Sequence, residues 1–553
     1  MKCKDLGAIL KNVLWLGLVF LFVACENPPT QFLYRAASVY TMEGGVVEAF
    51  LVQEGEILDL GDFESLRKAY PKAQVVDYTG KVLVPGFVDS HVHVHEFGQQ
   101  TLKANVQSAA TVEEMVQLLK AFFPNPAPGQ WLLGYGWDEG EWASKGYPDR
   151  RLLDEAFPNN PVKLQSLHGF AGFYNAKALE LAGIDTATPD PEVGRIIRRD
   201  DGTPSGVMET LAQQMVNQFV PEETVEDAKR AILSGLEKLA AAGITTIHEA
   251  GMTKISLQAF LELDEEGKLP IRVYGMLNGN DAEMMEEWFA RGPLTDSGRM
   301  FHVKGIKVFY DGSLGSRTAL LYRAYSDNPK AARMTERISM DKIRELAKYA
   351  AQHRFQMAVH AIGDLGNDRI LDVYEEALKG KGLDHRWRLE HAQIVSPGFY
   401  ERAAELGVWV SMQSSHAVGD SPWAEDRLGP DRIVHAYAWR NMLDHGVPFV
   451  LNSDLPGEPW EPMQTLYFAV TRSDLKGNPP GGWYGQQKIS VEEAMQAMTL
   501  SGAKSGFMET FTGSLAKGKR ADFVILAEDP WKIDPLKLHK IRVEAVYVNG
   551  KRL

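Results

Sequence analysis

The chain has 553 residues and a formal charge of −14, because 73 acidic residues outnumber 59 Lys and Arg. This acidity argues against nucleic acid as a partner, since binding phosphates requires a basic surface. With 44% hydrophobic and 24% charged residues, the composition is that of a globular protein without long disordered tracts.

The start of the chain is typical of a targeting signal. Residues 1–24 carry lysines ahead of an apolar run that is too short for a typical membrane span. The run ends in Ala24-Cys25, which resembles the bacterial lipobox, although Phe22 replaces the usual Leu. We expect a lipoprotein signal peptide, a lipid on Cys25, a tether over residues 25–31 and attachment to a membrane of the bacterial cell envelope. The alternative is an uncleaved N-terminal anchor, which also places the body outside the cytoplasm.

Cysteine usage limits the chemistry of the body. The two cysteines of the chain are Cys3 and Cys25, so signal removal and lipidation leave no free thiol. Disulfides, a Cys nucleophile and thiolate metal ligands are thereby excluded. A metal site would need His, carboxylate or Lys ligands.

Both ends of the body contain short alternating runs of apolar and polar residues separated by turns. This alternating pattern predicts strands in residues 32–84 and again in residues 505–553. The two ends are expected to pair into one small β-sandwich domain.

Between these ends, strand-like runs alternate with helical patterns, as in parallel β/α architecture. Eight runs predict a TIM barrel, a (β/α)8 domain over residues 85–504: Val82–His93, Thr245–Ala250, Ile271–Leu277, Val303–Asp311, Gln356–His360, Arg388–His391, Val408–Gln413 and Pro448–Asp454. Residues from about 98 to 235 exceed one helix and contain strand-like runs of their own. We expect an inserted substructure there, over the barrel mouth.

Candidate metal ligands occur where the predicted strands end. His91 and His93 are two residues apart, so the period of a strand places them on one face. His360, His391 and Asp454 each end another run. Because active sites of such barrels lie at the carboxyl ends of the strands, these side chains are expected to converge on a metal.

Lys307 is unusual because it lies inside a strongly apolar run. A buried lysine must be paired, neutral or extended to the surface, since an isolated buried ammonium is very costly. One interpretation is a salt bridge to Asp311 or another carboxylate. The other is a neutral amine with a chemical role.

The order His91, His93, Lys307, His360, His391, Asp454 resembles the binuclear amidohydrolase superfamily. Further motifs resemble its family 3 branch, which includes N-substituted formamide deformylase: Gly136-Trp137-Asp138-Glu139, Ser166-Leu167-His168-Gly169, Asn175-Ala176-Lys177-Ala178-Leu179 and Asp311-Gly312-Ser313-Leu314-Gly315-Ser316-Arg317-Thr318-Ala319. The resemblance extends from about residue 32 to the end of the chain.

The resemblance implies two divalent metal ions, taken to be zinc, and hydrolysis of an amide, formamide or cyclic amide by a metal-activated water. His91 and His93 would hold one ion, and His360 and His391 the other. Lys307, carboxylated by CO₂, would bridge them. Asp454 would be the general acid and base. A mononuclear centre is an alternative, because His95 could compete as a ligand.

Four residues are candidates for contacting a small amide substrate: Trp137, His168, Tyr310 and Arg317. For Trp137 a core position is equally compatible with the sequence, and His248, His416 and Trp460 are further candidates near the strand ends. Two other function classes stay open, namely a metal-dependent phosphoester hydrolase and an inactive ligand-binding lipoprotein. By analogy with related enzymes, a homodimer is expected.

Overall fold

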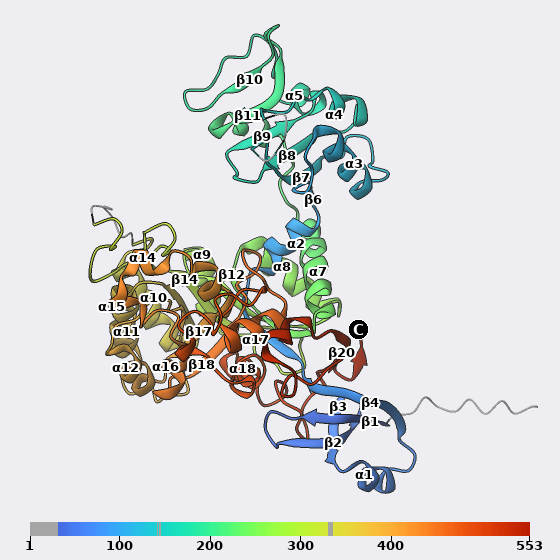
Figure 1. The fold of residues 1–553 in the computed structure, drawn as a ribbon, viewed down its shortest axis with the longest axis vertical. Coiled ribbons are helices and arrows are strands. Elements are labelled where there is room, and N and C mark those ends of the chain that lie inside the picture. The colour runs from blue at the N-terminus through green and yellow to red at the C-terminus, as the bar shows by residue number, and fades with distance from the viewer. Residues whose placement is uncertain (1–30, 141, 143–144, 330–335) are drawn as a thin grey trace, which may run out of the picture.

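The computed structural model describes residues 31–140, 142, 145–329 and 336–553 (Figure 1). The expected signal peptide, residues 1–24, lies outside the described residues, as does the tether apart from Gln31. Among the helices that the structure describes, none is both long and apolar enough to cross a membrane.

Strands from both ends of the chain form one mixed sheet beside the barrel (Figure 1). Its order is β21-β20-β19-β4-β1-β2-β3, with bounds β1 Gln31–Tyr40, β2 Val46–Gln53, β3 Glu56–Gly61, β4 Gln74–Pro85, β19 Phe523–Leu526, β20 Val543–Val548 and β21 Lys551–Arg552. The antiparallel pair β4 and β19 joins the two ends. The composite domain is therefore present, whereas a sandwich of two sheets is not confirmed.

Eight parallel strands form the barrel in the order β18-β17-β16-β15-β14-β13-β12-β5. Their bounds are β5 Phe87–Val92, β12 Ile244–Met252, β13 Arg272–Asn278, β14 Phe301–Phe309, β15 Gln356–Ala361, β16 Arg388–His391, β17 Trp409–Gln413 and β18 Phe449–Asn452. Two backbone hydrogen bonds link the ends of β5 and β18, from the Asp454 N–H to the His91 carbonyl and from the His93 N–H to the Leu455 carbonyl. The barrel is thus nearly closed, with these bonds at its mouth.

The first predicted strand is divided between the two sheets. Residues up to Pro85 belong to β4, and β5 begins at Phe87. Gly86 separates them because a Cβ at this position would lie 2.0 Å from Oγ1 of Thr245. The close packing of β12 against this bend therefore requires glycine.

Amphipathic helices cover the barrel (Figure 1): α2 Val94–Thr101, α7 Val225–Ala241, α8 Lys254–Glu265, α9 Ala282–Arg291, α10 Met340–His353, α11 Asp364–Leu378, α12 Phe399–Leu406, α13 Ser414–Asp420, α16 Trp439–Asp444, α17 Pro462–Thr471, α18 Val491–Ala497 and α19 Leu500–Ser505. In α7 a capping box of Thr224 and Asp227 starts the helix. The buried side chains of Ile232, Leu236 and Leu239 lie on one face of α7, as the helical period requires.

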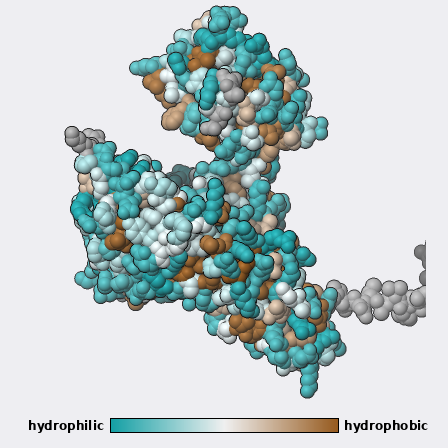
Figure 2. Space-filling model, in the orientation of Figure 1, coloured by the Kyte–Doolittle hydropathy of each residue, from teal (hydrophilic) through white to brown (hydrophobic). Residues whose placement is uncertain are grey.

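The inserted residues form a separate lobe with its own six-stranded sheet, in the order β10-β11-β9-β8-β7-β6. Its elements are β6 Ala104–Asn105, α3 Val112–Phe122, β7 Leu132–Trp137, α4 Arg151–Ala156, β8 Val162–Ser166, β9 Ala171–Tyr174, α5 Ala176–Leu181, β10 Ile196–Arg198, β11 Pro204–Glu209 and α6 Gln214–Asn217. The lobe has its own hydrophobic core and joins the barrel beside α2 and α7 (Figure 1). Its visible face mixes hydrophilic and hydrophobic residues (Figure 2).

Candidate metal centre

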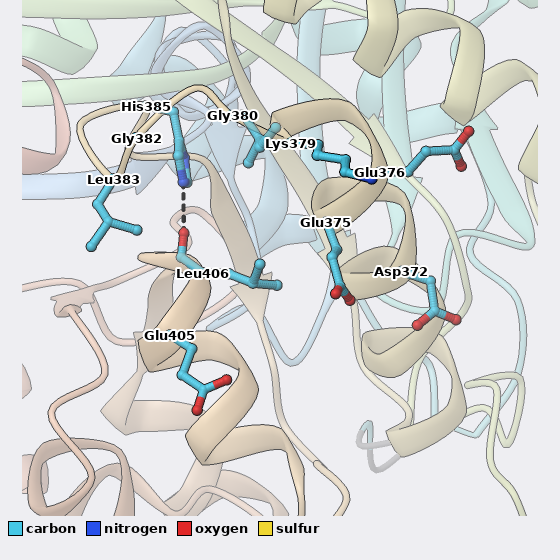
Figure 3. A pocket seen from close by; sticks show the side chains of 11 residues that line it. Asp372, Glu375, Glu376, Lys379, Gly380, Gly382, Leu383, His385, Glu405 and Leu406 are labelled. Atoms are coloured by element: carbon cyan, nitrogen blue, oxygen red, sulfur yellow. Dashed lines mark hydrogen bonds between the residues drawn. The ribbon is translucent and has the colours of Figure 1, made fainter.

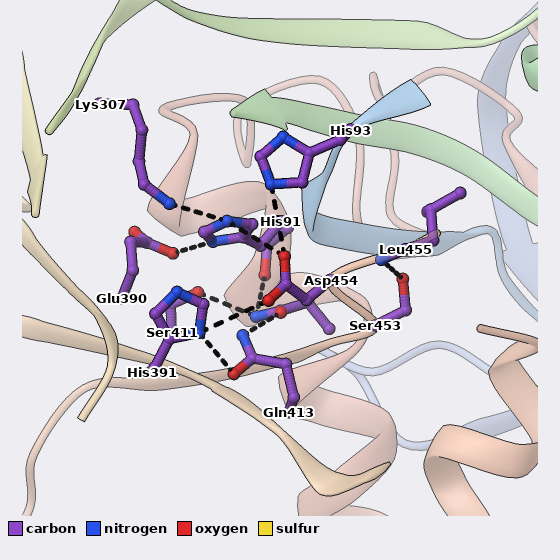
Figure 4. Close-up of polar contacts among 12 residues, drawn as sticks. His91, His93, Lys307, Glu390, His391, Ser411, Gln413, Ser453, Asp454 and Leu455 are labelled. Carbon is purple, nitrogen blue, oxygen red and sulfur yellow. Dashed lines mark hydrogen bonds and ion pairs between the residues drawn. The ribbon is translucent and has the colours of Figure 1, made fainter. Parts of the chain in front are cut away.

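Asp454 lies at the centre of a group of histidines at the barrel mouth (Figure 4). Its Oδ1 atom is 3.5 Å from Nε2 of His91 and 3.4 Å from Nε2 of His93. Its Oδ2 atom is 3.7 Å from Nδ1 of His391 and 3.8 Å from Nε2 of His416. One carboxylate therefore faces histidines from both sides of the barrel seam, which is the junction between β5 and β18.

His91 is fully buried between two charged side chains (Figure 4). Its Nδ1 atom is 2.5 Å from a carboxylate oxygen of Glu390, and its Nε2 atom is 2.9 Å from Nζ of Lys307. Burial, followed by repulsion from Lys307, lowers the pKa of His91 to about 4. The ring is therefore neutral at pH 7, which is the form that binds metals.

His360 and His391 form the second pair, with ring centroids 4.6 Å apart. Nε2 of His360 is 3.1 Å from the Gly312 carbonyl, and Nδ1 of His391 is 2.9 Å from Oε1 of Gln413. Burial lowers the pKa of His360 to about 3 and that of His391 well below its usual range. Both rings are thus neutral and anchored through one nitrogen, which leaves the other nitrogen as a potential ligand.

Lys307 points from β14 into this cluster and is fully buried (Figure 4). Burial lowers the pKa of its amine to about 8. Asp311 is not its partner, because that carboxylate accepts the backbone N–H groups of Leu320, Ile362 and Gly363. The structure therefore does not show the salt bridge to Asp311 that was one of the two interpretations of Lys307.

The carboxylate of Asp454 is held in its ionised form. Burial raises the pKa of Asp454, but polar contacts with the surrounding histidines, which include a hydrogen bond from His93, outweigh burial and lower the pKa well below its usual value. The residue also has a left-handed backbone, with φ of 59°. An ionised carboxylate in this position can accept a proton from a water molecule at the mouth.

Two other histidines have structural partners. His95 lies beside the cluster on α2, where its Nε2 atom is 2.9 Å from Oε1 of Glu223. His248 is buried in β12, and its Nδ1 atom accepts a hydrogen bond from Arg388. The competing ligand role suggested for His95 therefore has no support from its contacts.

The residues proposed to contact substrate are not brought together. Trp137 is fully buried in the core of the lobe and donates to the Leu164 carbonyl, whereas His168 interacts with Ser166 and Phe170 of the same lobe. The hydrogen bonds described for these two side chains are all made within the lobe, which joins the barrel at one side (Figure 1).

Tyr310 and Arg317 follow β14 at the carboxyl end of the barrel, but both have partners. The hydroxyl of Tyr310 donates to Glu336, and Arg317 forms an ion pair with Asp327 at 2.6 Å. A role in binding substrate would require Arg317 to exchange this carboxylate for one on the substrate.

A cavity of about 600 Å³ lies elsewhere, between the ends of α11 and α12 (Figure 3). Four acidic side chains are among its lining residues, namely Asp372, Glu375, Glu376 and Glu405, and His385 donates to the Leu406 carbonyl beside it. Its residues precede either β16 or β17, so the cavity lies at the amino ends of these strands, opposite the metal centre.

Two ligand groups can each hold a metal ion. They are His91, His93 and Asp454, and His391, His416 and Asp454, with ligand atoms within 4.8 Å of one another in each group. These nitrogen and carboxylate donors suit zinc and similar divalent ions. His416 comes from α13, immediately after β17.

The residues beneath the ligands are not among the predicted site residues, and they are chiefly Arg388, Glu390, Gln413 and Asn452. All four are buried, and Arg388 and Glu390 form a bidentate ion pair. Charged residues two apart in a buried strand were the available signal, because they point to the barrel interior.

The amidohydrolase family profile matches residues 74–553. LONG AFTER FAR-RED 3 of Arabidopsis thaliana is 30% identical over 575 residues, covering 99% of this chain and 95% of that protein. N-substituted formamide deformylase of Arthrobacter pascens is 29% identical over 532 residues, covering 93% and 96%. A crystal structure of an uncharacterized metal-dependent hydrolase from Pyrococcus furiosus superimposes with a TM-score of 0.75 at 29% identity, covering 91% of this chain and 100% of that chain.

Proposed function

The chain belongs to the amidohydrolase family and is a hydrolase of carbon–nitrogen bonds other than peptide bonds, and we propose that its substrate is a small amide, formamide or cyclic amide. The observation that carries this proposal is the position of Asp454 between His91 and His93 on one side and His391 on the other. A carboxylate so placed can move a proton between a water molecule and a leaving nitrogen.

The proposed centre holds two divalent ions, with zinc as the expected metal. His91 and His93 would hold one ion, and His360 and His391 would hold the other. Bound ions supply Lewis acidity, which polarises a substrate carbonyl and lowers the pKa of water. The neutrality of the buried rings supports this assignment.

Carboxylated Lys307 is the proposed bridge between the two positions. Its neutral amine attacks the carbon of CO₂, an N–C bond forms, one C–O double bond becomes the carbamate anion, and the nitrogen releases a proton. Full burial and the low pKa of this lysine favour the neutral amine that the reaction needs.

The chain's own groups account for the proton transfers. Asp454 takes a proton from the water that attacks the carbonyl carbon. It then delivers that proton to the nitrogen as the C–N bond breaks, so a carboxylic acid and an amine form, and the acid then ionises by releasing its proton to the solvent. The ionised state of Asp454 suits its first role as a base.

The test combines metal analysis with activity on two substrate panels. About two ions per chain and turnover of amides or formamides, with no turnover of phosphoesters, are expected. Turnover of phosphoesters alone would replace the proposal with a phosphoester hydrolase. Metal-loaded protein inactive on both panels would favour a ligand-binding role.

The N-terminal segment supports a separate proposal on location. We propose that Cys25 is lipidated and anchors the protein to a membrane of the bacterial cell envelope. The small residue before Cys25 at the end of an apolar run supports this assignment.

A further inference from the structure

A continuous chain of buried hydrogen bonds lies beneath the histidines. On one side, Arg388 forms a bidentate pair with Glu390, at 2.6 and 2.8 Å, and Glu390 contacts Nδ1 of His91 (Figure 4). Arg388 is also fixed by the Ser90 carbonyl at 2.7 Å and by Oγ of Ser411 at 3.0 Å. Its guanidinium therefore has little freedom to move.

The chain continues from Ser411 to the other metal position. Nδ2 of Asn452 donates to Oγ of Ser411 at 2.8 Å, and Oδ1 of Asn452 accepts from Nε2 of Gln413 at 2.6 Å. Oε1 of Gln413 then lies 2.9 Å from Nδ1 of His391 (Figure 4). Four strands, β5, β16, β17 and β18, contribute to this network.

The bonds that Arg388 makes have a fixed direction, and the structure gives the direction of the others. An arginine only donates, so Ser411 accepts from it, and an ionised carboxylate only accepts. In the structure the amide of Asn452 turns its NH₂ toward Ser411, whose second lone pair accepts the hydrogen bond, and its oxygen toward Gln413. This leaves the oxygen of Gln413 facing His391, so the Nδ1 atom of His391 must carry the proton.

His91 has the same proton assignment for an independent reason. Glu390 accepts on the Nδ1 side, while the Lys307 amine donates on the Nε2 side. Nδ1 therefore carries the proton, and the lone pair of Nε2 accepts from Lys307 in the metal-free chain. His360 has the opposite tautomer, with the proton on Nε2, because this atom faces the Gly312 carbonyl, which can only accept.

We propose that Arg388, Glu390, Asn452 and Gln413 form a positioning network that selects the Nδ1–H tautomer of both His91 and His391. The network thereby presents Nε2 of each ring as the ligand atom and couples the two metal positions. This inference rests on the proposed metal centre for its purpose, whereas the tautomers themselves are a property of the metal-free chain.

An apolar core would serve stability at least as well as these buried polar groups. Replacing a buried ion pair by apolar residues of similar volume is often neutral or stabilising, so burial of Arg388 and Glu390 argues for an orienting role. Partners of metal-bound histidines typically change metal affinity by about 10- to 100-fold when removed.

The test uses the full chain and a matched pair of substitutions. Gln413→Met removes the acceptor from His391, and Gln413→Glu keeps an acceptor there. Gln356→Met is the control, because Gln356 is a fully buried amide in β15 that bonds Tyr274, Arg386 and Ser505 and none of the clustered histidines.

The first readout is the affinity of metal-stripped protein for Zn²⁺, measured against a competing chelator. We expect a loss of about 10- to 100-fold for Gln413→Met, recovery toward the wild type in Gln413→Glu and no change in Gln356→Met. Unchanged Zn²⁺ affinity in a folded Gln413→Met variant would overturn the claim that the network supports metal binding through His391.

The second readout is the tautomer of each ring in the metal-stripped wild type, from long-range ¹H–¹⁵N NMR correlations assigned by His91→Gln and His391→Gln. Protons on Nδ1 of both rings are expected, and protons on Nε2 would overturn the proposal even if Gln413→Met does not fold. If the wild type binds no metal yet shows Nδ1–H rings, the metal centre fails while the tautomer assignment survives.

Discussion

Replacing Lys307 by Met should stabilise the metal-free protein at neutral pH. Burial lowers the pKa of this lysine to about 8 from an ordinary 10.5, which corresponds to about 3 kcal/mol. At any pH below 8 the folded and unfolded chains both bind this proton, so burying the charged amine lowers the stability of the folded state by that amount. Loss of the bond to Nε2 of His91 offsets about 1 kcal/mol, so Lys307→Met should gain about 2 kcal/mol.

The sign of the pH dependence follows from the same shift. Between pH 8 and 10.5 the unfolded chain binds more protons than the folded chain, so wild-type stability rises with pH in this window. The advantage of Lys307→Met should therefore shrink as the pH approaches 10.5.

Denaturant unfolding of metal-stripped protein in CO₂-free buffer, at pH 7 and pH 10, measures this difference. Lys348→Met is the control, because Lys348 is exposed on α10 and its loss should change stability little. A less stable Lys307→Met, or a gain that is equal at both pH values, would refute the reasoning.

Three further predictions concern the centre and the anchor. Asp454→Asn should retain bound metal but lose about 10²- to 10⁴-fold in kcat on any amide substrate found, and full activity would remove Asp454 from the proton transfers. Lys307→Ala should lose both metal ions together and the mass of CO₂ that bicarbonate adds to the wild type; retention of two ions would exclude the carbamate bridge. Cys25→Ser should move the protein out of the membrane fraction, and unchanged membrane attachment would point to an uncleaved anchor.

The strands of the barrel were the most predictable part of the fold. Their apolar runs are bounded by turns, so the eight predicted ranges coincide with the observed strands to within a few residues. The exception is the run from Val82, where one continuous apolar pattern covers two sheets. Only the close approach of Thr245 to Gly86 reveals the division, and that contact joins residues distant in sequence.

The placement of side chains was predictable only where strand ends determine it. His91, His391 and Asp454 converge because parallel strands of one barrel end at one mouth. Trp137 instead packs in the lobe, and no local pattern specifies how an inserted domain is oriented relative to the barrel. Gln413 is an ordinary polar residue in its own strand, and its role depends on partners from β16 and β18.

Closure of the barrel and assembly of the centre depend on the same few residues. Asp454 and His391 both have left-handed backbones, with φ of 59° and 77°, which cost about 1–3 kcal/mol each unless the surrounding structure fixes them. For Asp454 that support includes the hydrogen bond from its N–H to the His91 carbonyl, which joins β18 to β5. The bond that closes the seam therefore also holds the Asp454 carboxylate beside His91. Opening the barrel at this seam would therefore also separate the Asp454 carboxylate from His91.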